Sequence, residues 1–168
     1  MMKPSVWGLL LVFVLSLSCA APPARIAFGE NIQIKLERTA CYGTCPAYTV
    51  TINRTGDTTF EGSKFIAKGT PIALPTRTIT LTRDKVDALK AEFDRIGFLS
   101  LKDDYTSGSP DCPQPVTDSP SVITSLTIGD KTKTVRHYLG CGSTETLFQL
   151  TALENKIDDI AGTAEWLK

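Results

Sequence analysis

The sequence has neither a surplus of charge of one sign nor more than a single histidine. Its 18 lysines and arginines balance 18 aspartates and glutamates, and the charges are interspersed rather than gathered into runs. A surface without a basic excess does not attract nucleic acid or an anionic membrane surface. No low-complexity segment interrupts the chain. These absences argue against a nucleic-acid-binding protein and leave an ordinary folded domain.

Recognisable catalytic and metal-binding patterns are also missing. The one histidine, His137, has no nucleophile motif such as Gly-x-Ser-x-Gly to work with. Asp103, Asp104, Asp111 and Asp118 gather around a proline-rich loop, but their spacing matches no calcium-binding loop. We therefore expect no catalytic residue, no metal site and no cofactor, and we do not predict an enzyme.

The first 19 residues have the pattern of an export signal. Lys3 supplies the positive charge, and residues 6–17 form a nearly unbroken apolar run. That run is too short to span a bilayer as a stable helix, and its flanks are typical of a cleaved signal peptide. We expect an exported protein on the periplasmic side of a bacterial envelope, with a signal peptide over residues 1–19 and a tether over residues 20–30.

The end of the signal leaves two cleavage sites open. Residues 15–19 resemble a bacterial lipobox that ends in a lipidated cysteine, Cys19, although Ser16 stands where that pattern prefers leucine. The alternative is ordinary cleavage after Ala20. Lipidation is favoured because Cys19 is otherwise unpaired among five cysteines. It would attach the protein to a membrane through its N-terminus.

Residues 31–168 predict a single α+β domain. Alternating apolar residues indicate half-buried strands, and apolar residues three and four apart indicate two amphipathic helices. The strands are joined by tight turns, which favours a mainly antiparallel sheet of hairpins with both helices packed on one face. We expect strands over 31–38, 48–52, 58–65, 78–81, 122–128 and 132–139, helices over 82–96 and 143–162, a short strand or extended connection over 98–101, and loops over 66–76 and 103–120.

The remaining four cysteines predict two disulfides in an oxidising compartment. Sequence alone permits three pairings, and we favour Cys41–Cys45 and Cys112–Cys141. A closed loop of about 5 residues stabilises a domain by roughly 2 kcal/mol, and one of about 30 residues by roughly 3.6 kcal/mol. The second disulfide is therefore the better stabiliser, and the first is better suited to a local role.

One motif carries a resemblance to a known family. Residues 38–48 contain Cys-x-Gly-x-Cys-Pro-x-Tyr, followed by a strand and a glycine-turn hairpin. With Asp104-Tyr105, residues 117–120, His137-Tyr138 and the last helix, this pattern resembles domain of unknown function 6438 over roughly residues 31–160. That family occurs in bacterial exported proteins and lipoproteins and has no established activity. The resemblance implies an architecture and a compartment, but no function.

Two functional hypotheses remain for the motif. In the first, Cys41 and Cys45 form a structural disulfide in a non-catalytic binding or structural module. In the second, they act with His137 in a copper-binding or thiol-redox accessory protein, because the motif also resembles that of Sco-type copper chaperones. Two thiolates and an imidazole suit copper. The first hypothesis is favoured because the motif enters a strand, whereas an activated thiol usually sits at a helix N-terminus.

A binding module would use its longest loop and its exposed aromatic residues. Loops of this length in small domains often carry function. The candidate partner-binding residues are Tyr42, between the two cysteines, and Tyr105, Asp111 and Asp118 in or beside the 103–120 loop. The expected partner is an envelope protein or ligand whose identity the sequence does not specify.

Overall fold

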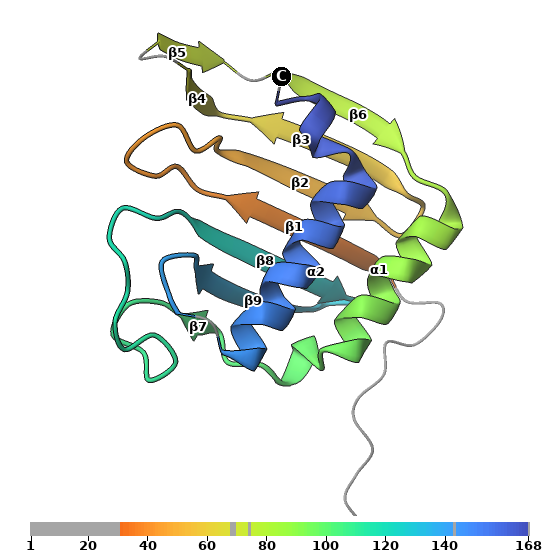
Figure 1. Cartoon of the computed structure of the whole chain (residues 1–168). Coiled ribbons are helices and arrows are strands. Elements are labelled where there is room, and N and C mark those ends of the chain that lie inside the picture. The colour runs from red at the N-terminus through yellow and green to blue at the C-terminus, as the bar shows by residue number, and fades with distance from the viewer. Residues whose placement is uncertain (1–30, 68–69, 74, 143, 168) are drawn as a thin grey trace, which may run out of the picture.

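A central sheet of seven strands carries two long helices (Figure 1). The computed structural model describes residues 31–67, 70–73, 75–142 and 144–167. Within them the elements are β1 (Ile32–Arg38), β2 (Tyr48–Asn53), β3 (Asp57–Gly62), β4 (Lys64–Ala67), β5 (Thr70–Ala73), β6 (Thr76–Thr80), α1 (Arg83–Arg95), β7 (Asp104–Tyr105), β8 (Ser121–Ile128), β9 (Lys131–Tyr138) and α2 (Glu145–Ala161), with 3-10 turns at Phe98–Ser100 and Thr163–Glu165.

Strand β1 lies in the middle of the sheet. The order is β6-β3-β2-β1-β8-β9-β7, and every pair is antiparallel except β7 with β9. Ile34 of β1 lies opposite both Ile52 of β2 and Leu126 of β8. Each of these side chains is almost fully buried, so this row of the sheet forms part of the core.

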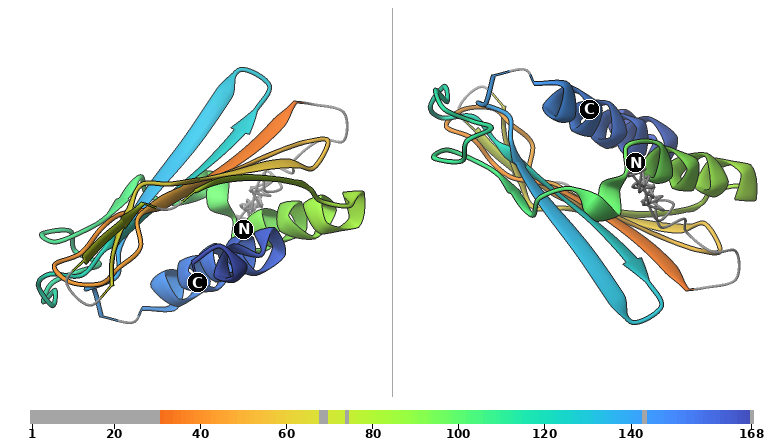
Figure 2. Two further views of the ribbon diagram at one scale, coloured as in Figure 1. Left: turned by 90° about the horizontal axis from the view of Figure 1, so that it is seen from above. Right: turned by 90° about the horizontal axis from the view of Figure 1, so that it is seen from below.

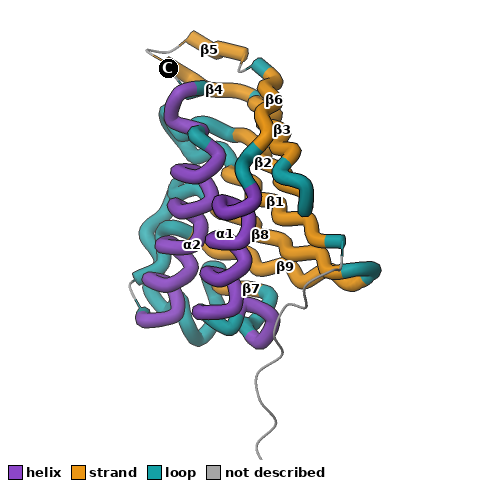
Figure 3. Tube along the Cα trace, turned by 90° about the vertical axis from the view of Figure 1, so that its right-hand side faces the viewer, coloured by secondary structure: helices purple, strands orange, loops and turns teal. Residues whose placement is uncertain are grey.

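Both helices cover the same face of the sheet, as Figures 2 and 3 show from two directions. The apolar positions of each helix recur every three or four residues, so one side of the helix is buried against the strands. Helix α2 starts after Thr144, whose side chain accepts a hydrogen bond from the Leu147 amide. The buried helical residues include Val86, Leu89 and Phe93 of α1 and Leu147, Leu150, Leu153 and Ile157 of α2. The predicted α+β class, with a mainly antiparallel sheet, is confirmed.

The opposite face of the sheet is polar. It carries the alternate residues of each strand, and hydroxyl pairs such as Ser125–Thr134 and Thr127–Thr132 hydrogen bond across it at 3.0 and 2.9 Å. Alternation between apolar and polar residues is typical of an antiparallel sheet with one solvated face.

Four sequence-based expectations were wrong. Residues 66–76, expected to form a loop, contribute to the β4–β5 ribbon and to the start of β6. Pro71 belongs to β5, in a two-stranded ribbon where a proline that cannot donate a hydrogen bond is tolerated. Residues 98–100 form a 3-10 turn, and the loop over 103–120 contains the short strand β7. The expected strand over 58–65 divides at Ser63 into β3 and β4.

The predicted signal peptide over residues 1–19, the tether over 20–30 and the lipidation site at Cys19 lie outside the described residues. Among the residues that are described, none of the helices combines the length and the apolar character needed to cross a membrane.

Candidate functional site

One end of the sheet gathers the long connections of the chain. The loops over residues 39–47, 106–120 and 139–142 lie together at the left of Figure 1 and form what we call the disulfide end. Cys41 is bonded to Cys45 and Cys112 to Cys141, with Cα–Cα distances of 5.4 and 5.0 Å. These are the two pairs favoured from the sequence.

The first disulfide closes a small ring that projects Tyr42 into solvent. The side chain of Tyr42 is 90% exposed, the most exposed of the large apolar side chains in the described region. Gly43 has a φ of 146°, a conformation that favours glycine and lets the ring close. The ring is anchored through Thr39, whose amide donates to the Ser121 carbonyl at 2.9 Å and whose hydroxyl accepts from the Ser121 amide at 2.8 Å.

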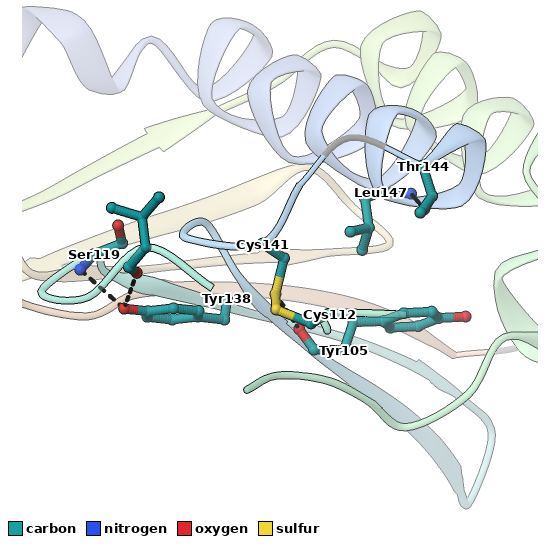
Figure 4. The surroundings of a disulfide bond; sticks show 8 residues. Tyr105, Cys112, Ser119, Tyr138, Cys141, Thr144 and Leu147 are labelled. Atoms are coloured by element: carbon teal, nitrogen blue, oxygen red, sulfur yellow. Dashed lines mark hydrogen bonds between the residues drawn. A yellow bond between two sulfur atoms is a disulfide. The ribbon is translucent and has the colours of Figure 1, made fainter. Parts of the chain in front are cut away.

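The second disulfide fastens the long loop to the chain ahead of α2 (Figure 4). Cys112 is completely buried. The Val116 amide donates to the Gly140 carbonyl at 2.7 Å, and the Tyr138 hydroxyl donates to the Val116 carbonyl at 2.8 Å. A Cβ at Gly140 would lie 2.2 Å from the Val116 oxygen, so only glycine permits this approach. The long loop is therefore held at several points along its length.

A groove of about 340 Å³ opens between these loops. It lies at the end of the sheet, where consecutive residues of β8, Ser121 and Val122, both line it. Cys45 and Thr44 connect its wall directly to the ring that carries Tyr42. The lining residues are Arg38, Thr39, Thr44, Cys45, Pro46, Pro120, Ser121, Val122 and Leu139.

Arg38, which lines the groove, is held by a polar cluster on helix α2. The Arg38 guanidinium donates through Nε to Asp158 at 2.6 Å and through Nη2 to Asn155 at 3.1 Å. The Tyr48 hydroxyl donates to the other oxygen of Asp158 at 2.9 Å. Burial and the Asp158 carboxylate raise the pKa of Tyr48, so this hydroxyl stays protonated and remains a donor. The charge of Arg38 is thus matched within the domain.

An exposed phenylalanine lies on the same side of α2. Phe148 precedes Asn155 by seven residues, which is nearly two full helical turns, so both project from one side of the helix. Phe148 is 67% exposed, and Leu139, at the groove, is 37% exposed. Of these exposed apolar side chains, Leu139 lines the groove, whereas Phe148 lies near the start of α2.

His137 belongs to a different environment, inside the core. Its Nδ1 lies 3.1 Å from both carboxylate oxygens of Glu154, and the two side chains are 4% and 1% exposed. Burial raises the pKa of Glu154, against the opposing influence of His137. Cys41 and Cys45 are bonded to each other. Across the described residues no group of three or more histidine, cysteine, aspartate or glutamate side chains is arranged to hold a metal ion.

None of the four candidate partner-binding residues lines the groove itself, although Tyr42 belongs to the ring whose Thr44 and Cys45 do. Tyr105 is buried, and its hydroxyl accepts a hydrogen bond from the Lys102 amide at 3.2 Å. Asp111 pairs with the Lys102 ammonium at 2.7 Å. Asp118 adopts a φ of 63° in the long loop, where its carboxylate accepts from Thr117 at 3.4 Å.

Sequence reasoning missed the groove itself. Pro46, Pro120 and Leu139 come from three separate segments, and no local pattern connects them. The available signals were a proline near the end of each loop, Pro46 in 39–47 and Pro120 in 106–120, and an apolar residue, Leu139, directly after the last strand.

Comparison with known families gives one match. The family model described as a domain of unknown function (DUF6438) matches residues 32–161, well over half of the chain. The matched region starts with the first residue of β1 and ends with the last residue of α2, so it contains both disulfides. No curated protein matches the chain.

Proposed function

We propose that this chain, which belongs to the DUF6438 family, is an exported binding module that holds a partner protein at its disulfide end. The observation that carries the proposal is Tyr42, an almost fully exposed aromatic side chain on a disulfide-closed ring that also walls a groove. Tyrosine is enriched among the residues that dominate binding energy at protein interfaces.

The groove favours an apolar side chain of a protein partner. Its volume of about 340 Å³ lies at the lower limit of small-molecule pockets and is suited to one or two large side chains. Cys45, Pro46, Pro120 and Leu139 supply an apolar lining. The one charged group, Arg38, is already paired with Asp158, so the groove offers no unmatched charge to an ionic ligand.

The ring supports binding by limiting the conformational cost. A five-residue ring closed by Cys41 and Cys45 holds the Tyr42 backbone before a partner arrives. Ordering a mobile side chain or loop on binding costs about 0.5–1.5 kcal/mol per immobilised side chain, and a preorganised ring reduces that cost. We assign the first disulfide to this role, and the second to holding the long loop at the groove.

The proposed compartment is the periplasmic side of a bacterial envelope. Structural disulfides persist in oxidising compartments, which supports export. We further propose that a lipid on Cys19 anchors the chain and that residues 20–30 form a tether, which could extend about 40 Å at most. Mass spectrometry of the exported protein tests this proposal: an unmodified N-terminus at Ala21 would exclude the lipid.

Site-specific photocrosslinking in the native cell tests the binding function. A benzophenone amino acid replaces Tyr42 in one strain and Thr59, on the polar face of the sheet, in a control strain. We expect a discrete adduct from position 42 that is lost when Leu139→Asp places a charge at the groove, and no such adduct from position 59. Equal labelling from both positions would reject the disulfide end as the binding site.

The partner recovered from that adduct then permits a quantitative test. We expect Tyr42→Ala to weaken binding by about 2 kcal/mol, as truncation of a dominant interface residue does, and Tyr42→Phe to retain most of the affinity. Fluorescence anisotropy with the purified partner measures both, with Thr59→Ala as the matched control. Unchanged affinity in Tyr42→Ala would contradict the proposal.

A further inference from the structure

The two outer strands of the sheet differ in how far they are protected. At one edge, β7 is two residues long, and the 106–120 loop follows it directly. At the other edge, β6 has five residues, and among the described strands it pairs with β3 alone (Figure 1). All five side chains of β6 are exposed. The edge formed by β6 is therefore the longer and the more open of the two.

Alternate residues of β6 direct their backbone groups away from β3. The Leu81 amide donates to the Gly56 carbonyl at 2.8 Å, which makes these two residues a hydrogen-bonded pair at the end of the β3–β6 ladder. Hydrogen-bonded and non-hydrogen-bonded pairs alternate along an antiparallel ladder, so Ile79 and Arg77 also bond to β3. The residues between them therefore direct amide and carbonyl groups outward. These outward residues are Thr76, Thr78 and Thr80.

The outward groups have no protection against a further strand. In the described part of the chain, no backbone hydrogen bond reaches them from another segment. Unpaired amides and carbonyls on an exposed strand are a template for strand addition, and proteins usually block such an edge with proline, lysine or a bulge. The β6 sequence Thr-Arg-Thr-Ile-Thr contains neither proline nor lysine, and its register with β3 runs unbroken from Thr76 to Thr80.

The order of residues in β6 makes this edge complementary to a copy of itself. Threonine occupies positions 76, 78 and 80, so the strand reads nearly the same in both directions. When two such strands run antiparallel around Thr78, this residue lies opposite its own copy, and Thr76 lies opposite Thr80. A twofold-symmetric contact requires a surface that is self-complementary in this way. The order therefore favours a second copy of the chain over an unrelated segment as the occupant.

In that register every outward backbone group finds a partner. Both members of each threonine pair direct their amide and carbonyl toward the other copy, so each pair exchanges two hydrogen bonds and the two copies share about six. The side chain of Thr78 lies on the polar face, because Thr78 is opposite Thr59 of β3. Hydroxyl pairs already hydrogen bond across that face between β8 and β9, and cross-strand threonine pairs stabilise strand pairing.

The other face of the same edge carries apolar surface that a second copy would cover. Ile79 lies opposite Thr58 of β3 and is 38% exposed. In the register around Thr78, it lies opposite Arg77 of the other copy. The methylene groups of arginine can pack on isoleucine while the guanidinium stays in water. Both faces of the edge are therefore compatible with the same register.

The length of β6 limits the strength of this contact. Five residues extend about 17 Å. A contact along one strand edge is smaller than the roughly 1,200 Å² that standard stable interfaces bury, so association should be weak and should depend on concentration. Chains anchored in one membrane by the lipid proposed on Cys19 would be concentrated at its surface.

We propose that β6 is a self-association edge, at which two copies of the chain pair antiparallel around Thr78 and continue one sheet into the other. This contact does not involve the groove at the disulfide end, so either proposal can fail without the other.

Sedimentation equilibrium of the chain, made without lipid by Cys19→Ser, tests the edge. We expect the average mass to rise from one copy toward two as the concentration increases. Thr78→Pro should lower the association constant by about thirtyfold or more, because it removes the two central hydrogen bonds. The Thr78 amide points away from β3, so this proline removes no hydrogen bond within the sheet.

The matched control is Thr78→Ala, which keeps the amide and should lower the association constant by at most about fivefold. A chain that stays monomeric at every concentration would overturn the second copy as the occupant. Equal association of Thr78→Pro and Thr78→Ala would overturn backbone pairing at this edge.

A charge exchange at the same position tests the register, and it does not require the strand to accommodate proline. Thr78→Lys and Thr78→Glu each place like charges directly opposite one another, so each variant alone should associate more weakly than the parent chain. An equimolar mixture should form a mixed dimer, because opposite charges then face each other. The same exchange at Thr134, on the polar face of β9, should produce no mixed dimer. A Thr78 mixture that associates no better than its separate components would overturn the proposed register.

Discussion

The two ends of the sheet are held together by different means. At the disulfide end, the connections between strands are long, and covalent bonds at Cys41–Cys45 and Cys112–Cys141 hold them. At the opposite end, which we call the turn end (residues 53–57, 81–83 and 129–130), the connections are short, and backbone hydrogen bonds such as Leu81 to Gly56 hold them. Closing a loop costs more entropy as the loop lengthens, so a long loop benefits more from a cross-link.

The difference extends to the hollows that each end encloses. The groove between the long loops has a volume of about 340 Å³ and an apolar lining, whereas a cavity of about 760 Å³ between α1 and the short turns is lined by charged side chains of both signs. Each mode of reinforcement predicts a different sensitivity to mutation and to solution conditions.

Removal of the longer disulfide should have the largest effect. We expect Cys112→Ala with Cys141→Ala to lower the free energy of unfolding by about 3.6 kcal/mol, the chain-entropy value for a closed loop of this length. Urea unfolding followed by circular dichroism measures the loss. A loss below about 1 kcal/mol would mean that hydrogen bonds hold the long loop without covalent help.

A single methyl group at the turn end should cost nearly as much. We expect Gly56→Ala to destabilise the domain by about 3 kcal/mol, because alanine at a φ of 91° is strained and its Cβ would overlap the Leu81 carbonyl. Gly129→Ala is the matched control, because Gly129 has a φ of 61° but no atom lies near the added Cβ. This substitution should lower the free energy of unfolding by about 1 kcal/mol. Equal losses in thermal unfolding would show that the Leu81 contact is unimportant.

The shorter disulfide should matter less for stability than for binding. Cys41→Ser with Cys45→Ser should lower the free energy of unfolding by about 2 kcal/mol, because the closed ring is short. The same change should weaken capture of the partner at Tyr42 in the crosslinking experiment. If stability falls and crosslinking from position 42 is unaffected, the ring has no part in presenting Tyr42.

Lowering the pH should destabilise the turn end locally and leave the disulfide end unchanged. This is the smallest of the four predicted effects. Hydrogen bonds from Thr55 and Asn53 lower the pKa of Asp57 below its usual 3.8. A carboxylate whose pKa is lower in the folded state than in the unfolded state stabilises the fold at pH values above its unfolded-state pKa. That stabilisation is lost as the pH falls through its folded-state pKa. Hydrogen exchange at the 53–57 turn, corrected for intrinsic rates, should therefore accelerate below about pH 4.

Two comparisons show whether Asp57 is the cause. In Asp57→Asn the corrected exchange of this turn should no longer depend on pH, and the Val116 amide at the disulfide end should not respond in either protein. Acceleration at Val116 as well would indicate global unfolding instead.

Local features of the fold were predictable from sequence, and long-range ones were not. The β2–β3 and β8–β9 hairpins and both helices follow from patterns within a few residues of each other. The pairing of β1 with β8 joins segments from opposite halves of the chain, so no local sequence pattern predicts it. Pro71 and its neighbours predicted a loop, because proline usually interrupts a strand, yet they form the β4–β5 ribbon.

The same limit applies to the groove and to the cavity. Tyr42 could be selected from sequence because it stands between two cysteines, but the groove beside it depends on Pro120 and Leu139, which are distant along the chain. The cavity between α1 and the short turns is equally hidden in the sequence. Arg54 and Lys90 are unremarkable in sequence, and only the packing of α1 over the sheet places them at one cavity.

The central position of β1 also determines how the domain would respond to mechanical load. Pulling on the chain ahead of Ile32 would stretch β1 along its own axis. Its hydrogen bonds to β2 and β8 lie across that axis, so they would be loaded in shear, all at once, rather than unzipped one after another. Under the proposed lipid tether, tension that enters ahead of Ile32 would therefore pass along β1 to Arg38 at the groove.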